Sequence, residues 1–334
     1  MLAIVGPTAC GKSSLALAVA EQLACEIISA DSMQVYRGLD IGTAKPDATE
    51  LALVPHHLVD VAEPDEDFSV ARYQALGREA IACVEARGRL PVVVGGTALY
   101  VRALLRDYDF AMPGADPELR RELAREAAQH GQAQLRAELE RVDARAAARI
   151  HPNDLRRTIR ALEVWRLTGQ PLSATWRSGR LLYDALLVGI DLDREVLYRR
   201  IDARVDQMVR RGLVEEVRSL VARGFGSWLV SGQALGYKEI AEHLEGRATL
   251  EDAVARIKQA TRNYAKRQLT WFRREPGLVW LRRDAPGAAC GRDTGAAEAT
   301  TTTETDQEGR ARNQALAEQL MELVRGRWAN GANG

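Results

Sequence analysis

Short apolar runs separated by helical patterns organise the first third of the chain. The runs at residues 3–5, 26–30, 55–61 and 90–94 predict β-strands. Residues 12–23 and 69–87 carry apolar side chains at helical spacing and predict two helices, the second starting near Ser69. Residues 90–94 are apolar without interruption, as expected of a strand covered on both faces of a parallel sheet. Strands that alternate with helices predict an α/β fold with a doubly wound parallel sheet.

The pattern changes at the Pro/Gly-rich stretch that begins at Pro113. Ala, Arg, Glu and Leu then dominate in helical patterns, until an apolar run at 185–191 resumes the strand pattern. A last edge strand is expected at 278–281, and beyond Asp284 a Gly/Ala/Thr/Glu-rich stretch predicts disorder, followed by a possible helix at 311–328. We therefore expect an α/β core at 1–112, a helical insertion domain at 113–182, a second, mostly helical part of the core at 183–283, and a tail at 284–334.

Composition places the chain among ordinary globular proteins. It has 334 residues, 46% apolar and 28% charged. No apolar run approaches the roughly 18 residues of a membrane span, and the first residues lack the features of a signal peptide. The four cysteines form no C-x-x-C pair, which argues against a zinc ribbon or a disulfide framework; Cys25 and Cys83 are expected to be small buried hydrophobes. A reducing compartment, the cytoplasm, is expected.

A formal net charge of zero hides an uneven distribution. Residues 1–70 carry 11 acidic and 3 basic side chains, a net of −8. Residues 141–180 carry 9 basic and 3 acidic side chains (+6), and residues 256–283 carry 9 basic and 1 acidic (+8). Two basic blocks on a neutral protein indicate a localised surface for a polyanion; Arg-rich helices that merely face solvent are the alternative.

A phosphate-binding loop follows the first predicted strand. The sequence from Gly6 to Ser13 fits G-x-x-x-x-G-K-[ST] and lies between a strand and a helix, the context that this P-loop motif requires. Backbone N–H groups and the helix N-terminus favour phosphate here, Lys12 adds a point charge, and Ser13 offers a hydroxyl to Mg²⁺. We expect no apolar strand to end in the acidic residue of a Walker-B element, which weakens an NTPase interpretation.

Two polar residues follow neighbouring strands of the predicted sheet. Asp31 comes directly after the second strand and Thr97 after the fourth. Ligands of open α/β sheets bind outside the carboxyl ends of the strands, so both residues are expected to face the phosphate loop. Asp31 could instead cap a turn, and Thr97 could be only the N-cap of the helix that follows.

Several motifs together resemble the bacterial tRNA dimethylallyltransferase (tRNA isopentenyltransferase) family. Besides the phosphate loop they are the segments 28–36, 38–46, 55–58, 94–100, 151–154, 160–164, 233–238 and 266–271, which follow the family's order across residues 3–283. Ser13 stands where many family members have threonine, which keeps the hydroxyl. The family's motifs do not extend into the tail, so the resemblance assigns no role to residues 284–334.

The resemblance implies a P-loop core with a helical insertion that clasps the tRNA anticodon stem-loop. The implied reaction moves a dimethylallyl group from dimethylallyl diphosphate to N6 of the adenosine 3′ of the anticodon, in tRNAs reading codons that begin with U. Mg²⁺ is the implied cofactor, and we expect a monomer.

The resemblance also assigns roles to individual residues. Asp31 is implied as general base, with Thr97 and Arg204 as further catalytic residues. The implied diphosphate-binding residues are Gly6, Thr8, Ala9, Cys10, Gly11, Lys12 and Ser13, with Ser13 also the metal ligand. The implied tRNA-binding residues are Asp31, Ser32, Met33, Gln34, Arg120, Arg156, Arg157, Arg160, Gln233 and Lys238.

Two other interpretations remain at this point. A P-loop kinase, or an isopentenyltransferase acting on free adenine nucleotides, would use the same loop and aspartate but would not need the basic insertion. A non-catalytic RNA-binding NTPase would use ATP as a switch, and the absence of a recognisable Walker-B acid speaks against it.

Overall fold

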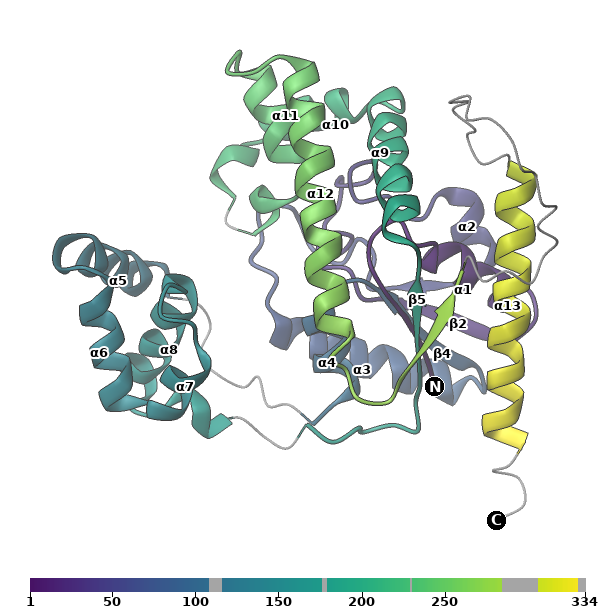
Figure 1. The fold of residues 1–334 in the computed structure, drawn as a ribbon, viewed down its shortest axis with the longest axis horizontal. Coiled ribbons are helices and arrows are strands. Elements are labelled where there is room, and N and C mark those ends of the chain that lie inside the picture. The colour runs from purple at the N-terminus through teal and green to yellow at the C-terminus, as the bar shows by residue number, and fades with distance from the viewer. Residues whose placement is uncertain (108–115, 176–178, 229, 284–305, 330–334) are drawn as a thin grey trace, which may run out of the picture. The chain divides into compact units, whose positions relative to one another are not determined.

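The structure, a computed structural model, describes residues 1–107, 116–175, 179–228, 230–283 and 306–329 (Figure 1). A six-stranded sheet forms its centre, with the order β3-β2-β4-β1-β5-β6 and all neighbours parallel. The strands are β1 (Leu2–Val5), β2 (Cys25–Ser29), β3 (His56–His57), β4 (Leu90–Gly95), β5 (Leu186–Asp191) and β6 (Leu278–Arg282). The predicted α/β fold with a doubly wound parallel sheet is confirmed.

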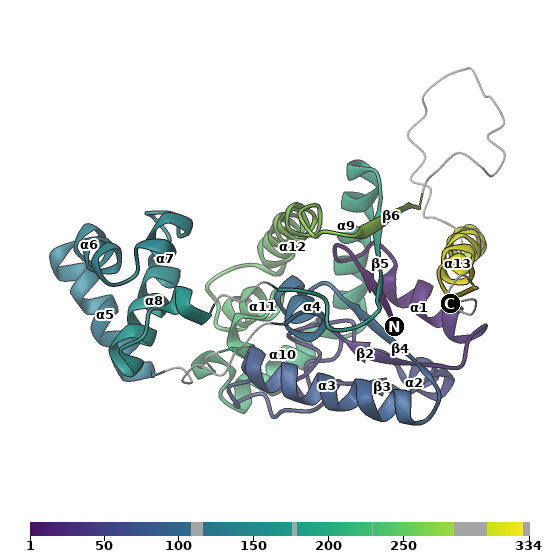
Figure 2. The same cartoon turned by 90° about the horizontal axis from the view of Figure 1, so that it is seen from below.

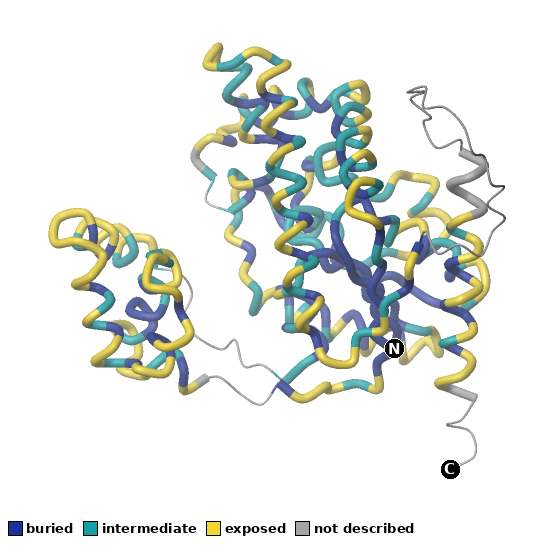
Figure 3. The backbone as a smooth tube through the Cα atoms, in the orientation of Figure 1, coloured by how far each residue is buried: buried dark blue, intermediate teal, exposed yellow. Residues whose placement is uncertain are grey.

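Apolar strands form this sheet because both of its faces are covered. All four residues of β1 are buried, as are five of the six in β4, and Leu2 pairs in register with Val92 (Figure 3). The chain moves from β1 to β2 through helix α1 (Lys12–Ala20) and returns from β3 to β4 through α3 (Val70–Ala86). Right-handed crossovers in opposite directions place their helices on opposite faces, as Figure 2 shows for α1 and α3.

The remaining helices of the core follow β2, β4, β5 and β6 in turn. They are α2 (Ala48–Leu53), α4 (Ala98–Leu105), α9 (Arg194–Arg210), α10 (Leu213–Ala222), α11 (Tyr237–Leu244), α12 (Leu250–Phe272) and α13 (Asp306–Ala329), with 3₁₀ turns at Phe225–Ser227 and Ser231–Gln233. Helix α12 packs on α9, and α13 packs on α1, where Leu316, Leu320 and Val324 join the core of the sheet. The helix expected at 311–328 is therefore present; the disorder expected at 284–305 falls outside the described residues.

The chain divides into two compact units. One contains the sheet, and the other consists of Leu105–Tyr183 with Ser69–Ala71. This second unit begins before residue 113, the boundary that the sequence pattern predicts. The helical unit contains α5 (Pro117–His130), α6 (Gln132–Val142), α7 (Ala144–Arg149), α8 (Leu155–Thr168) and a 3₁₀ turn at Leu172–Thr175. Its own core is built from Leu123, Leu135, Leu139, Leu162 and smaller apolar side chains.

Three sequence expectations are wrong. Strand β5 ends in Asp191, so an apolar strand does end in an acidic residue. The strand expected at 55–61 is only two residues long, because Leu58 (φ 62°) and Asp60 (φ 56°) leave the extended conformation. Ala62 instead forms an isolated bridge to Tyr36. Cys83 is exposed on α3 rather than buried, whereas Cys25 is buried, and burial raises the pKa of its thiol to about 11.

Candidate active site

The phosphate loop, residues 6–13, bends sharply between β1 and α1. Three of its residues have positive φ, namely Gly6 (144°), Ala9 (63°) and Gly11 (100°). Successive turns of this kind direct backbone N–H groups into a concavity that suits an anion. Cys10 is fully buried, as expected of a residue that only fills space under the loop. The loop thus has the backbone form that its sequence predicts.

Lys12 lies folded over the loop. Its Nζ donates a hydrogen bond to the Pro7 carbonyl at 2.7 Å. Burial lowers the pKa of the ammonium; Arg204 lowers it further, while the Cys10 thiol and Asp31 oppose the shift. Burial also lowers the pKa of Arg204, again opposed by Asp31. Two desolvated cations beside one carboxylate favour the arrival of a polyanion, since its charge would compensate theirs.

Two further arginines, absent from the predicted site, hold the phosphate loop. Arg200 of α9 donates from Nε to the Ala9 carbonyl at 2.9 Å. Arg283, buried after β6, donates from Nη1 to the Cys10 carbonyl at 3.0 Å. A Cβ on Gly11 would lie 1.8 Å from that Nη1, so the guanidinium packs directly against the glycine, whose φ of 100° also disfavours any other residue. The four-residue spacing from Arg204 could have pointed to Arg200; no sequence pattern pointed to Arg283.

Asp31 begins a turn at the carboxyl end of β2. Its Oδ1 accepts hydrogen bonds from the backbone N–H groups of Met33 (2.9 Å) and Gln34 (3.4 Å). The pKa shifts of Lys12 and Arg204 both include an interaction with the Asp31 carboxylate. Asp31 thus lies near enough to Lys12 and Arg204 for its charge to act on both, and it also begins the turn that the sequence left open as an alternative. Its role as the general base stays a prediction.

Thr97 faces the Asp31 segment. Its Oγ1 accepts the Ser32 N–H at 3.0 Å and lies 3.4 Å from the Ser32 hydroxyl. Its carbonyl accepts the N–H of Val101, the first bond of α4, so the backbone of Thr97 also starts that helix. The main chain of Thr97 thus begins α4, the alternative that the sequence left open, and its side chain bonds Ser32; a contact of Thr97 with a reactant stays a prediction.

Gln34 uses its side chain inside the protein. Its Oε1 accepts from the Ser29 hydroxyl at 2.9 Å, and its Nε2 donates to the carbonyls of Thr43 (3.3 Å) and Ala44 (3.1 Å). These bonds fold the segment that follows Asp31 back onto β2. Met33 and Ser32 are half-buried in the same turn. Base contacts by this segment stay a prediction.

The predicted tRNA-binding arginines of the helical unit differ in their surroundings. Arg120 donates from Nε (2.8 Å) and Nη2 (3.0 Å) to the fully buried carboxylate of Glu163, and Arg160 donates to it at 2.6 Å. Burial raises the pKa of Glu163, but the two arginines and the Asp116 N–H outweigh it and the net shift is downward. Arg156 is exposed, as is Arg157, which lies 3.4 Å from Asp154. The sequence analysis did not identify Glu163 as the shared partner of Arg120 and Arg160.

Gln233 ends the 3₁₀ turn at Ser231–Gln233, Lys238 is the second residue of α11, and both are exposed. Tyr237, between them, is fully buried and donates its hydroxyl to Oε1 of Glu216 at 2.6 Å. Gln233 and Lys238 are thus accessible on either side of the buried Tyr237. Contact of these two side chains with tRNA remains a prediction.

Ser13 presents an exposed side chain at the start of α1. Among the residues that the structure describes, no three His, Cys, Asp or Glu side chains gather as a metal site. Mg²⁺ commonly takes only one or two protein ligands and completes its shell with water and substrate phosphate. One loop hydroxyl beside a diphosphate site is compatible with that preference.

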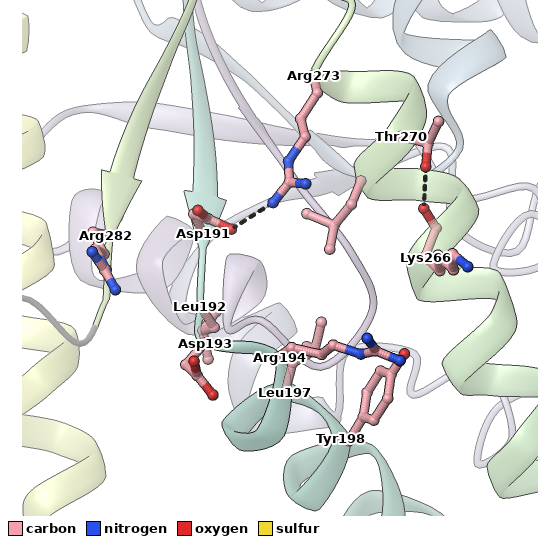
Figure 4. A pocket seen from close by; sticks show the side chains of 11 residues that line it. Asp191, Leu192, Asp193, Arg194, Leu197, Tyr198, Lys266, Thr270, Arg273 and Arg282 are labelled. Carbon is pink, nitrogen blue, oxygen red and sulfur yellow. Dashed lines mark hydrogen bonds and ion pairs between the residues drawn. The ribbon is translucent and has the colours of Figure 1, made fainter.

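A pocket of about 390 Å³ lies at the carboxyl ends of β5 and β6, beside α9 and α12 (Figure 4). Arg194, Lys266, Arg273 and Arg282 line it together with Asp191 and Asp193. Arg273 and Asp191 form an ion pair of 3.9 Å across it. The lining includes none of the predicted catalytic residues, so this pocket is separate from the phosphate-loop site.

Fold and site together define a P-loop α/β protein with an aspartate and two cations at the loop. A family model described as IPP transferase matches residues 34–275, and one described as isopentenyl transferase matches residues 1–60. The chain belongs to the IPP transferase family and is a prenyltransferase.

Similar proteins support this assignment. The tRNA dimethylallyltransferase of Geobacillus thermodenitrificans is 50% identical over 284 residues, covering 84% of this chain and 90% of that protein. The tRNA dimethylallyltransferase of Symbiobacterium thermophilum is 51% identical over 290 residues, 86% and 91% of the two chains. The crystal structure of a tRNA isopentenylpyrophosphate transferase from Bacillus halodurans matches with a TM-score of 0.62 at 41% identity, covering 97% and 98%. A eukaryotic dimethylallyltransferase acting on tRNA matches with a TM-score of 0.72 at 30% identity, covering 84% and 73%.

Proposed function

We propose that this protein transfers the dimethylallyl group of dimethylallyl diphosphate to N6 of the adenosine 3′ of the anticodon, in tRNAs reading codons that begin with U. The observation that carries the proposal is a phosphate loop, bent through positive φ angles and covered by Lys12, at the same sheet edge as the Asp31 turn, with the Asp31 charge acting on both Lys12 and Arg204. A base beside an anion site suits a reaction in which a nucleophile loses a proton while diphosphate departs. The family, and the tRNA substrate in the names of its members, support the acceptor.

In this reaction the adenine N6 attacks the allylic carbon, a C–N bond forms, and the C–O bond to diphosphate breaks with its electron pair on oxygen. The N6 proton passes to the Asp31 carboxylate, which the Met33 and Gln34 N–H groups hold in place through Oδ1. Lys12, Arg204 and the loop N–H groups stabilise the charge that grows on diphosphate. The adenine must leave its stack to reach Asp31.

Ser13 would hold Mg²⁺ through its hydroxyl. The bound ion would neutralise part of the diphosphate charge.

The exposed Arg156 and Arg157, together with Gln233 and Lys238, are the side chains we assign to the anticodon stem-loop. The described part of the chain contains no helix long and apolar enough to cross a membrane; we place the enzyme in the cytoplasm, as a monomer.

The test is transfer of a radiolabelled dimethylallyl group to an unmodified anticodon stem-loop, with Mg²⁺ supplied. Label on the adenosine 3′ of the anticodon, and none on a matched stem-loop with guanosine there, is the expected result. Label on free adenine nucleotides but not on the stem-loop would move the acceptor to a small molecule. Release of phosphate from ATP without transfer of label would indicate a kinase or NTPase and refute the proposal.

A further inference from the structure

Gln268 of α12 joins two loops of the active site. Its Oε1 accepts the N–H of Thr8 in the phosphate loop at 2.9 Å, and its Nε2 donates to the carbonyl of Gly96, after β4, at 2.9 Å. The side chain is buried, with 5% of the residue exposed. One amide thus bonds two backbone groups that lie 260 and 172 residues away along the chain.

The Gln268 amide packs tightly against Gly96, which follows β4. A Cβ at Gly96 would lie 2.2 Å from Gln268 Nε2 and 3.4 Å from the Gly6 carbonyl oxygen, so only glycine lets the amide approach this closely. The preceding Gly95 is held as tightly, since its Cβ would lie 2.1 Å from the Ala30 carbonyl oxygen. Gly96 therefore allows close contact with Gln268 and the phosphate loop, and Gly95 allows close contact with Ala30, the residue before Asp31.

Tyr264 extends the connection toward Asp31. It precedes Gln268 by four residues and so lies on the same face of α12. Its phenol group lies near Thr97 and Gln268; burial, followed by the nearby Asp31 charge, raises its pKa to about 12. Thr97, directly after Gly96, accepts the Ser32 N–H. Gln268 therefore bonds the phosphate loop and the residue before Thr97, whose side chain bonds the residue after Asp31.

We propose that Gln268 is a positioning residue, which fixes the phosphate loop relative to the Gly96-Thr97 turn and thereby sets the distance between the allylic carbon of the donor and Asp31. The inference rests on the proposed function. An apolar side chain of equal size would fill the same space, but it could not bond both loops. In the proposed reaction the phosphate loop binds dimethylallyl diphosphate. The Gly96-Thr97 turn orients the segment that begins at Asp31, which receives the adenine.

The experiment compares Gln268→Met, Tyr264→Phe and the control Gln259→Met in the full-length protein. Gln259 is exposed on the same helix and bonds only locally to Asn263 and Arg262. A reactant misplaced by about 1 Å loses about 100-fold in rate. For Gln268→Met we expect kcat per active site to fall about 10- to 100-fold, and both the KM for dimethylallyl diphosphate and the Ki for inorganic diphosphate to rise about tenfold, with the KM for the stem-loop within about twofold of native.

Tyr264→Phe keeps the Thr8–Gln268 bond, so it should lower kcat by about tenfold and leave the Ki for diphosphate unchanged. Active sites are counted by titration with inorganic diphosphate, which separates turnover from loss of folded protein. Native kcat, KM and Ki per active site in Gln268→Met, with only a lower Tm, would overturn the inference. If Gln268→Met does not fold, Tyr264→Phe decides: native kcat overturns the inference, and lowered kcat at native Ki supports it. Failure of the native protein to transfer label is a different result and rejects the proposed function itself.

Discussion

Replacing Glu216 by leucine should destabilise the protein well beyond what a surface glutamate contributes. The carboxylate accepts the Ile41 N–H (2.7 Å), the Gly42 N–H (3.2 Å) and the Tyr237 hydroxyl (2.6 Å). Tyr237 is fully buried, so its hydroxyl loses its acceptor at a cost of about 1–3 kcal/mol. The half-buried N–H groups can find water, and each loses about 0.5–1 kcal/mol. The expected loss in the free energy of unfolding is therefore about 3 kcal/mol.

Urea-induced unfolding followed by circular dichroism measures this loss as a lower midpoint at unchanged m. The neighbouring Glu215 provides the control, because its side chain is 69% exposed and pairs only with the exposed Arg218. Glu215→Leu should change the free energy of unfolding by no more than about 0.5 kcal/mol. Glu216→Gln, which keeps one acceptor oxygen, should fall between the two leucine variants. Equal midpoints for Glu216→Leu and Glu215→Leu would show that the three hydrogen bonds of Glu216 do not stabilise the folded protein.

Three other predictions follow from single contacts. Gly95→Ala should cost several kcal/mol, about 3 or more, because the new methyl meets the Ala30 carbonyl, whereas Gly226→Ala, with open space around it, should be neutral in the same unfolding assay. Glu163 has a lowered pKa in the folded protein, so its stabilisation is present above the ordinary value of 4.5 and is lost as pH falls below it; the difference in unfolding free energy between native protein and Glu163→Gln should shrink from pH 7 to pH 3. Asp31→Asn keeps an oxygen for the turn and should lose about 100-fold or more in kcat while binding the stem-loop normally; near-native turnover would show that another group is the base.

Much of the phosphate-loop site could be predicted because its residues follow the ends of parallel strands. The motif from Gly6 to Ser13 depends on neighbours in the chain, and the rule for the carboxyl ends of strands brought Asp31 and Thr97 to the same edge. Arg204 was placed only through the family resemblance, since a helical arginine carries no mark of which way it faces. Arg283 and Gln268 were missed for a different reason: their partners are backbone groups far away in the sequence.

The α/β class, the phosphate loop and the helical character of the segment after residue 113 could all be predicted from local patterns, because periodicity and backbone preferences act over a few neighbouring residues. The partners of the charged and polar side chains became apparent only in the folded protein. It turned Arg120 and Arg160 onto the buried Glu163 and left Arg156 exposed, although all three arginines read alike in the sequence. A buried charge must be paired, and the partner is chosen by packing between distant segments, which no local pattern records.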